Sequence, residues 1–173
     1  MKAVLSIAIL LALTPPTIAD VVEKAFGVWR LRTRTYTQMP PETLISVSTF
    51  ALDPPQASIA FVCAKKGPIF QKQLVVGAKG FANEPSGPAS LIEIKLAFDT
   101  GLTITADARL GGPLATVFAN STIDAAFRAS LDARLLDIQV GDDHGPVNVA
   151  GFAPAAIAFG KECDRLYREK SQK

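Results

Sequence analysis

The chain has 173 residues, of which 49% are hydrophobic, so it is long and apolar enough to bury a sizeable core within one domain. Its 18 basic and 16 acidic residues leave a formal net charge of +2, which excludes a bulk electrostatic field that would steer it to nucleic acid or to anionic lipid. No internal repeat and no linker divides the chain, so a single domain is expected.

The first 19 residues have the pattern of a signal peptide. Lys2 supplies a positive start, residues 3–13 are apolar, and two prolines precede the small residues at Thr17 and Ala19 that a signal peptidase recognises. The apolar run is shorter than the roughly 20 residues of a membrane-spanning helix, and no later run is long enough. We therefore expect cleavage after Ala19, a mature domain of residues 20–173, a periplasmic or secreted location and no membrane span. The alternative is an N-terminal core helix.

Short alternating runs separated by Pro, Gly, Asn and Asp follow from Val28 onward and predict strands. The expected strands are residues 28–38, 43–52, 58–64, 69–76, 91–98, 102–109, 134–140 and 147–150. In the run 91–98 every second residue is apolar and falls on one face, as in antiparallel sheets that have one solvated face. Residues 99–101 (Asp-Thr-Gly) favour a hairpin turn into the next strand.

Helical periodicity is confined to two later segments. A helix near 121–133 is predicted from apolar residues four apart, with Ser121 placed to cap its start. These apolar residues are Ile123, Phe127 and Leu131. A second helix runs to about Lys170, with Pro154 in its first turn. Its apolar stripe consists of Ala156, Phe159, Cys163 and Leu166 or Tyr167.

This order of elements predicts an α+β, mostly β fold. The expected architecture is an antiparallel sheet or β-sandwich, with a helix near 121–133 and a C-terminal helix packed on the sheet.

The two cysteines are predicted to form one disulfide, because exported proteins usually pair their cysteines. Cys63 closes the expected strand 58–64 and shares its apolar face, and Cys163 lies on the apolar stripe of the last helix. Both side chains therefore point inward, as a staple between helix and sheet requires. Such a bond would close a loop of about 100 residues, for which the chain-entropy model gives about 4–5 kcal/mol. A catalytic thiol is the disfavoured alternative, since nothing places the single histidine near either sulfur.

An arginine stripe stands out in the run WRLRTRTY. Arg30, Arg32, Arg34 and Tyr36 project from one face of the expected strand, and Trp29, Leu31 and Thr33 project from the other. Three guanidinium groups in a row are a candidate contact for a carboxylate, a phosphate or an acidic glycan. The alternative is a solvated face whose charge is balanced by acidic neighbours across the sheet.

The single histidine, His144, lies in an expected turn at residues 141–145 beside Asp142 and Asp143. Carboxylate and imidazole groups bind metals, but three consecutive residues rarely converge on one ion, so a polar hairpin tip is the preferred interpretation. The chain contains no GxSxG motif, P-loop or dinucleotide fingerprint. We therefore expect no catalytic residue, no metal and no cofactor.

Several short segments carry a family resemblance. The strand ending at Cys63, a charged hairpin, a helix before LLDIQV and the segment VNVAGFAPAAIAFGKEC resemble small exported proteobacterial proteins. The pattern is similar to periplasmic accessory proteins associated with type VI secretion, which pair an early strand cysteine with one on the last helix. The segment 147–155 also resembles the end of the invasion-associated locus B family.

The chain departs from both families. Val62 stands where an arginine commonly precedes the early cysteine, and the additional cysteines of the invasion-associated family are absent. The resemblance implies an exported β-rich module with one disulfide, and it carries over no catalytic or binding residue.

From these features we expect a non-enzymatic binding or accessory module of the cell envelope. It would contact an envelope protein or an anionic envelope polymer through its surface. The alternative is a small exported inhibitor of a hydrolase, for which the loop at residues 81–88 is the candidate inhibitory segment.

Overall fold

The computed structural model describes residues 18–37, 41–49, 57–77, 91–111 and 114–169. The expected signal-peptide residues before Ile18 and the loop 81–88 lie outside this part of the chain. The described elements, in chain order, are β1 (Ile18–Phe26), β2 (Trp29–Tyr36), β3 (Glu42–Thr49), β4 (Ser58–Lys66), β5 (Ile69–Gly77), β6 (Leu91–Phe98), β7 (Thr103–Gly111), β8 (Leu114–Val117), α1 (Asn120–Asp132), β9 (Leu135–Val140), β10 (Asp143–Asn148) and α2 (Phe152–Arg168).

All of the described strands belong to one antiparallel sheet. Their spatial order is β1-β2-β3-β4-β5-β8-β7-β6-β9-β10. The fold is therefore α+β and mostly β, and the single sheet is the first of the two expected arrangements. A tight hairpin joins β1 to β2, and Gly27 makes its turn at a φ of 61°, in the left-handed region that glycine adopts without strain.

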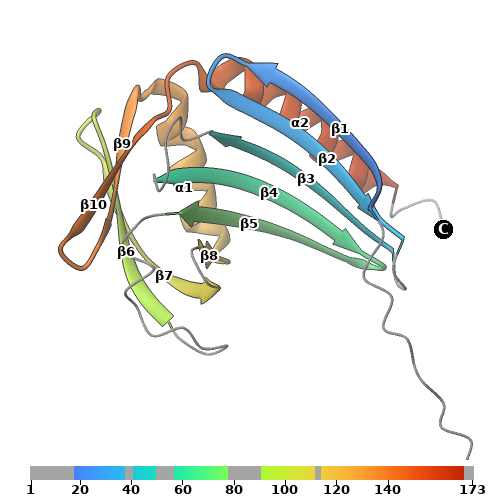
Figure 1. The fold of residues 1–173 in the computed structure, drawn as a ribbon, viewed down its shortest axis with the longest axis horizontal. Coiled ribbons are helices and arrows are strands. Elements are labelled where there is room, and N and C mark those ends of the chain that lie inside the picture. The colour runs from blue at the N-terminus through green and yellow to red at the C-terminus, as the bar shows by residue number, and fades with distance from the viewer. Residues whose placement is uncertain (1–17, 38–40, 50–56, 78–90, 112–113, 170–173) are drawn as a thin grey trace, which may run out of the picture.

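The sheet curls around its helices (Figure 1). Strands β6, β9 and β10 run at a steep angle to β2, β3 and β4. Helix α1 lies between these two groups of strands. Helix α2 covers the same inner face over β1 to β4. The indole Nε1 of Trp29 on β2 donates a hydrogen bond of 3.2 Å to the carbonyl oxygen of Val149, just after β10. The two ends of the sheet therefore approach each other across the core.

Aromatic rings fill the space where the helices meet the sheet. Phe152, at the start of α2, packs against Trp29, Phe61 and Phe127 with ring centroids 4.3, 5.3 and 4.9 Å away. Trp29 is fully buried, and Leu31, two residues along the same face of β2, is also in the core. The predicted division of β2 into an apolar inner face and an arginine outer face is thus what the structure shows.

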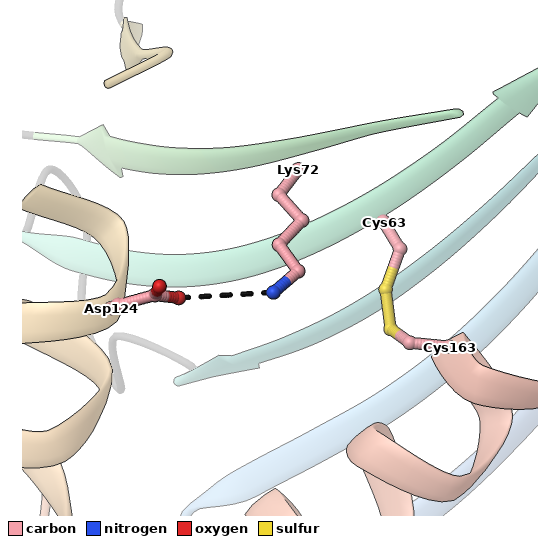
Figure 2. Close-up of a disulfide and its surroundings, with 4 residues drawn as sticks. All are labelled: Cys63, Lys72, Asp124 and Cys163. Atoms are coloured by element: carbon pink, nitrogen blue, oxygen red, sulfur yellow. Dashed lines mark ion pairs between the residues drawn. A yellow bond between two sulfur atoms is a disulfide. The ribbon is translucent and has the colours of Figure 1, made fainter. Parts of the chain in front are cut away.

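The predicted disulfide between Cys63 and Cys163 joins β4 to α2, with the two Cα atoms 6.0 Å apart. Figure 2 shows it beside a second link, an ion pair of 3.7 Å between Lys72 of β5 and Asp124 of α1. Lys72 is the cross-strand partner of Cys63. Two neighbouring positions of the sheet are therefore each linked to a helix: Cys63 to α2 by the disulfide, and Lys72 to α1 by the ion pair.

Two strands were not expected from the sequence, and a third begins earlier than predicted. Strand β1 lies at the edge of the sheet and is solvated on both faces, so its residues lack the alternation that marks a half-buried strand. Strand β8 has only 4 residues, too few for a period to show. The turn expected at 141–145 is shorter, because β10 starts at Asp143 and includes His144 and Gly145.

Both helices lie close to their predicted positions but differ in detail. Helix α1 starts at Asn120, and its N-cap is Ala119 without a side-chain hydrogen bond, so Ser121 does not cap it. Its buried residues are Ile123, Ala126 and Ser130, and Phe127 packs against the core, so Leu131, which is 40% exposed, is the one member of the predicted stripe that faces away from the core. On α2 the apolar stripe ends with Leu166, which is buried, and not with Tyr167, which is exposed.

Neither described helix is both long and apolar enough to cross a membrane.

Candidate functional site

The arginine stripe occupies the outer face of β2, away from both helices, and one carboxylate of β1 lies beside it. Glu23, the cross-strand partner of Arg32, is 2.6 Å from the Arg32 Nε atom and 3.8 Å from the Arg30 Nε atom. Arg30 also donates a hydrogen bond of 2.6 Å to the carbonyl oxygen of Gly27. One acidic neighbour across the sheet therefore partly balances these two guanidinium groups, as the alternative interpretation of the stripe predicts.

Arg34 and Tyr36 continue the stripe toward the other end of β2. Arg34 lies opposite Val21 of β1 and Leu44 of β3, and within the described part of the chain its guanidinium has no carboxylate within 4 Å. Tyr36 lies opposite Glu42. The proposed role of these four residues in binding an anion stays a prediction, and Arg34 is the member of the stripe that is best placed to serve it.

His144 does not lie at a hairpin tip but on β10, at the opposite edge of the sheet. Its Nδ1 atom is 2.8 Å from a carboxylate oxygen of Asp137 on β9, and Gln139 donates a hydrogen bond of 3.2 Å to the same oxygen. Asp142 and Asp143, the expected neighbours, are not its partners. The pair is on the solvent-facing side of the strands, with the imidazole 58% exposed. Among the described residues, no group of three or more His, Cys, Asp or Glu is arranged to hold a metal ion.

A groove lies on the inner face, where the sheet extends past its apolar core. Along the inner face of β2, Trp29 and Leu31 are buried, but the next two residues are Thr33 and Thr35. Thr43 of β3 is the cross-strand partner of Thr35, so hydroxyl groups from two strands lie side by side. This end of the sheet is too polar to join the core, and the last turns of α2 pass over it without filling the space.

We call this space the α2 groove; its volume is about 460 Å³. The groove is lined by Val22 and Lys24 of β1, Leu31, Thr33 and Thr35 of β2, Thr43 of β3, and Glu162, Arg165, Leu166 and Glu169 from the end of α2.

Charged residues of α2 form one wall of the groove. The Arg165 guanidinium donates hydrogen bonds to Glu162, one turn before it, at 3.0 Å and to Glu169, one turn after it, at 2.5 Å. The hydrogen bond to Glu162 is the main reason why the pKa of Arg165 lies above its ordinary value. The three side chains therefore stabilise one another along the helix as ion pairs three and four residues apart.

Lys24 is the charged residue of the opposite wall. It lies on the inner face of β1, opposite the apolar Leu31, and it is exposed. Within the described part of the chain no carboxylate lies within 4 Å of its ammonium group. The groove thus combines hydroxyl groups, a wall of paired charges on α2 and a lysine that has no carboxylate within 4 Å among the described residues.

Part of this groove can be predicted from the amino-acid sequence. Thr33 was correctly assigned to the face of Trp29 and Leu31, and the change from aromatic to threonine along that face marks where the core ends. The spacing of Glu162, Arg165 and Glu169 by three and four residues is the usual one for ion pairs on a helix. That α2 lies over the threonines depends on the path of the whole chain, which no local pattern contains.

Comparison of the chain with family models, with curated proteins and with solved structures returns no match. The resemblance to type VI secretion-associated accessory proteins and to the invasion-associated locus B family stays a prediction.

Proposed function

We propose that this protein is an exported, non-enzymatic binding module that holds a segment of an envelope partner in the α2 groove. The observation that carries the proposal is the groove itself: an open space of about 460 Å³ between the end of α2 and three strands, lined by hydroxyl and charged groups. Its volume lies within the range of about 300–1,000 Å³ that is typical of ligand pockets in proteins.

The Cys63–Cys163 disulfide supports an extracytoplasmic location, because disulfides persist in oxidising compartments and are rare in the cytosol. The signal-peptide pattern supports a periplasmic or secreted protein more specifically. Cleavage after Ala19 would leave seven of the eight β1–β2 residue pairs in place, because only Ile18–Tyr36 precedes the cleavage site. Export is therefore compatible with the fold of the described domain.

The proposal is tested by capturing partners from an envelope extract with the tagged protein. The informative variant is Thr35→Trp, which puts an indole into the groove, and we expect it to lose at least one captured protein that the wild type retains. Thr105→Trp is the matched control, because it makes the same change at an exposed strand position of β7, far from the groove.

Thermal unfolding of both variants separates blocked binding from lost folding. If Thr35→Trp folds and captures the same proteins as the wild type, the groove is not the binding site and the proposed function is wrong.

A further inference from the structure

We infer that the partner is an extended polypeptide strand that pairs with β1 and directs an acidic side chain to Lys24 in the α2 groove. This inference rests on the proposed function and names the chemistry of the partner. It is carried by three features that meet at one place: an unpaired sheet edge, a groove that adjoins it and a cation in that groove.

The first feature is the edge itself. Strand β1 is the terminal strand of the sheet, and within the described part of the chain no segment pairs with its second edge. After cleavage behind Ala19 this strand keeps residues 20–26, and no described segment pairs with its outer edge, so its N–H and C=O groups are a template for another strand, unless proline, bulges or covering segments protect it. Its one irregularity lies at the start, between Ile18 and Asp20, so the stretch from Val21 to Phe26 is regular.

The second feature is the position of the groove next to this edge. Val22 and Lys24 line the α2 groove from the inner face of β1 and are both exposed. Val21, on the opposite face, is 51% exposed, and Val22 is 47% exposed. A strand added to β1 would place every second side chain over the groove, beside these two residues, and would cover the two valines. Main-chain hydrogen bonds would supply affinity, and the groove would supply selectivity.

The third feature is charge. On the outer face of β1, Glu23 is already paired with arginines of β2, so that face has its ionic partners. On the inner face, Lys24 faces Leu31 and, among the described residues, has no carboxylate within 4 Å. An acidic side chain directly opposite Lys24 on the added strand would form a favourable cross-strand pair, whereas a lysine there would be repelled. The inner-facing residue of the partner is therefore expected to be acidic.

The probe is a blocked peptide, Thr-Val-Thr-Glu-Thr-Val-Thr, whose valines and glutamate share one face. Its pattern is the same in both directions, so it can pair with β1 in either orientation. Binding is followed by the anisotropy of a labelled peptide and by the amide chemical shifts of the protein. We expect the largest shifts in β1 and along the groove.

Two variants test the charge. Lys24→Glu should weaken binding of the glutamate peptide by roughly 3- to 10-fold, because an attractive cross-strand pair becomes a repulsive one. The same variant should bind a peptide with lysine in place of glutamate more tightly than the wild type does. Lys95→Glu, at an exposed position of β6, is the matched control and should change neither affinity.

Two isomers of the peptide test the pairing. One carries an N-methyl group on the central glutamate, and the other carries it on the adjacent threonine. Because successive N–H groups of a strand point to opposite sides, each isomer blocks one orientation of pairing, and the isomer that blocks the preferred orientation should lose more binding. Full affinity of both isomers, or peptide-induced shifts confined to other strands, would overturn the inference.

A concentration-dependent dimer with protected β1 amides in the absence of peptide would assign the edge to a second copy of the chain and would also overturn the inference.

The experiments distinguish failure of this inference from failure of the proposed function. If the peptide experiments fail while Thr35→Trp still abolishes capture, the groove binds a partner in another manner. If the peptide binds at β1 while capture is insensitive to Thr35→Trp, the proposed function is the part that fails.

Discussion

Among single residues, Glu23 determines how much of the charge of the arginine stripe is left to act on other molecules. Its carboxylate lies within 4 Å of both Arg30 and Arg32. Pairs of this kind at a surface contribute only about 0–1 kcal/mol to folding, because water and salt screen them. Their larger effect is on the field outside the sheet, where one carboxylate offsets much of two guanidinium groups.

The variant Glu23→Gln should therefore bind polyanions more strongly than the wild type, with little change in stability. We expect it to elute from a polyanionic resin at a higher salt concentration, and its free energy of unfolding should change by less than about 1 kcal/mol. Arg34→Gln should elute earlier than the wild type, because within the described part of the chain Arg34 has no acidic partner within 4 Å. If both variants elute with the wild type, the stripe is a solvated face that binds no anion.

Between elements, the Cys63–Cys163 bond is the covalent link that holds α2 on the sheet. It closes a loop of 100 residues, and loops of this length are where removal of a disulfide frees the unfolded chain most. The double variant Cys63→Ala, Cys163→Ala should lower the free energy of unfolding by about 2–5 kcal/mol, as measured by urea denaturation. The wild type in the presence of a thiol reductant should shift in the same direction, and the variant should not respond to the reductant. An unchanged urea midpoint in the double variant would contradict the predicted role of the bond.

This bond also shows how far the sequence predicts the fold. Alternation places Cys63 on an inner face and helical spacing places Cys163 on an apolar stripe, and the predicted export of the chain makes their pairing the simplest expectation. The same two periodicities located most strands and both helices. They did not reveal β1, where both faces are solvated and Glu23 and Lys24 interrupt the apolar residues of either face. This edge strand is recognised by its pairing with β2, and the alternation of its own residues does not encode that pairing.

The candidate site was less predictable than the fold for a related reason. The arginine stripe was visible because its members are two residues apart on one strand. The α2 groove combines β1, β2 and β3 with the end of a helix more than 100 residues later in the chain, so it exists only once the chain has closed. The sequence predicts that some acidic residue lies beside the stripe. To identify it as Glu23 requires the register of β1 against β2.

At the scale of the whole molecule, the fold depends on how tightly the curled sheet closes. Strand β10 approaches the residue that precedes β4, and a Cβ atom added to Gly145 would lie 2.5 Å from the Cβ atom of Ala57. Such a separation is shorter than any ordinary contact, so glycine at this position permits the approach. The hydrogen bond from Trp29 to the carbonyl oxygen of Val149 lies just beyond the same strand.

Gly145→Val should therefore destabilise the protein by about 1–3 kcal/mol, because a larger side chain forces the two ends of the sheet apart. The measurement is urea unfolding followed by the emission of Trp29, the only tryptophan of the chain, which reports directly on the closed end of the sheet. Gly160→Ala is the matched control. An added Cβ at Gly160 meets nothing within 4 Å, and alanine in a helix interior should stabilise by about 0.5–1 kcal/mol. Wild-type stability in Gly145→Val would show that β10 does not pack against Ala57, and the curl of the sheet would then have to be held by the helices alone.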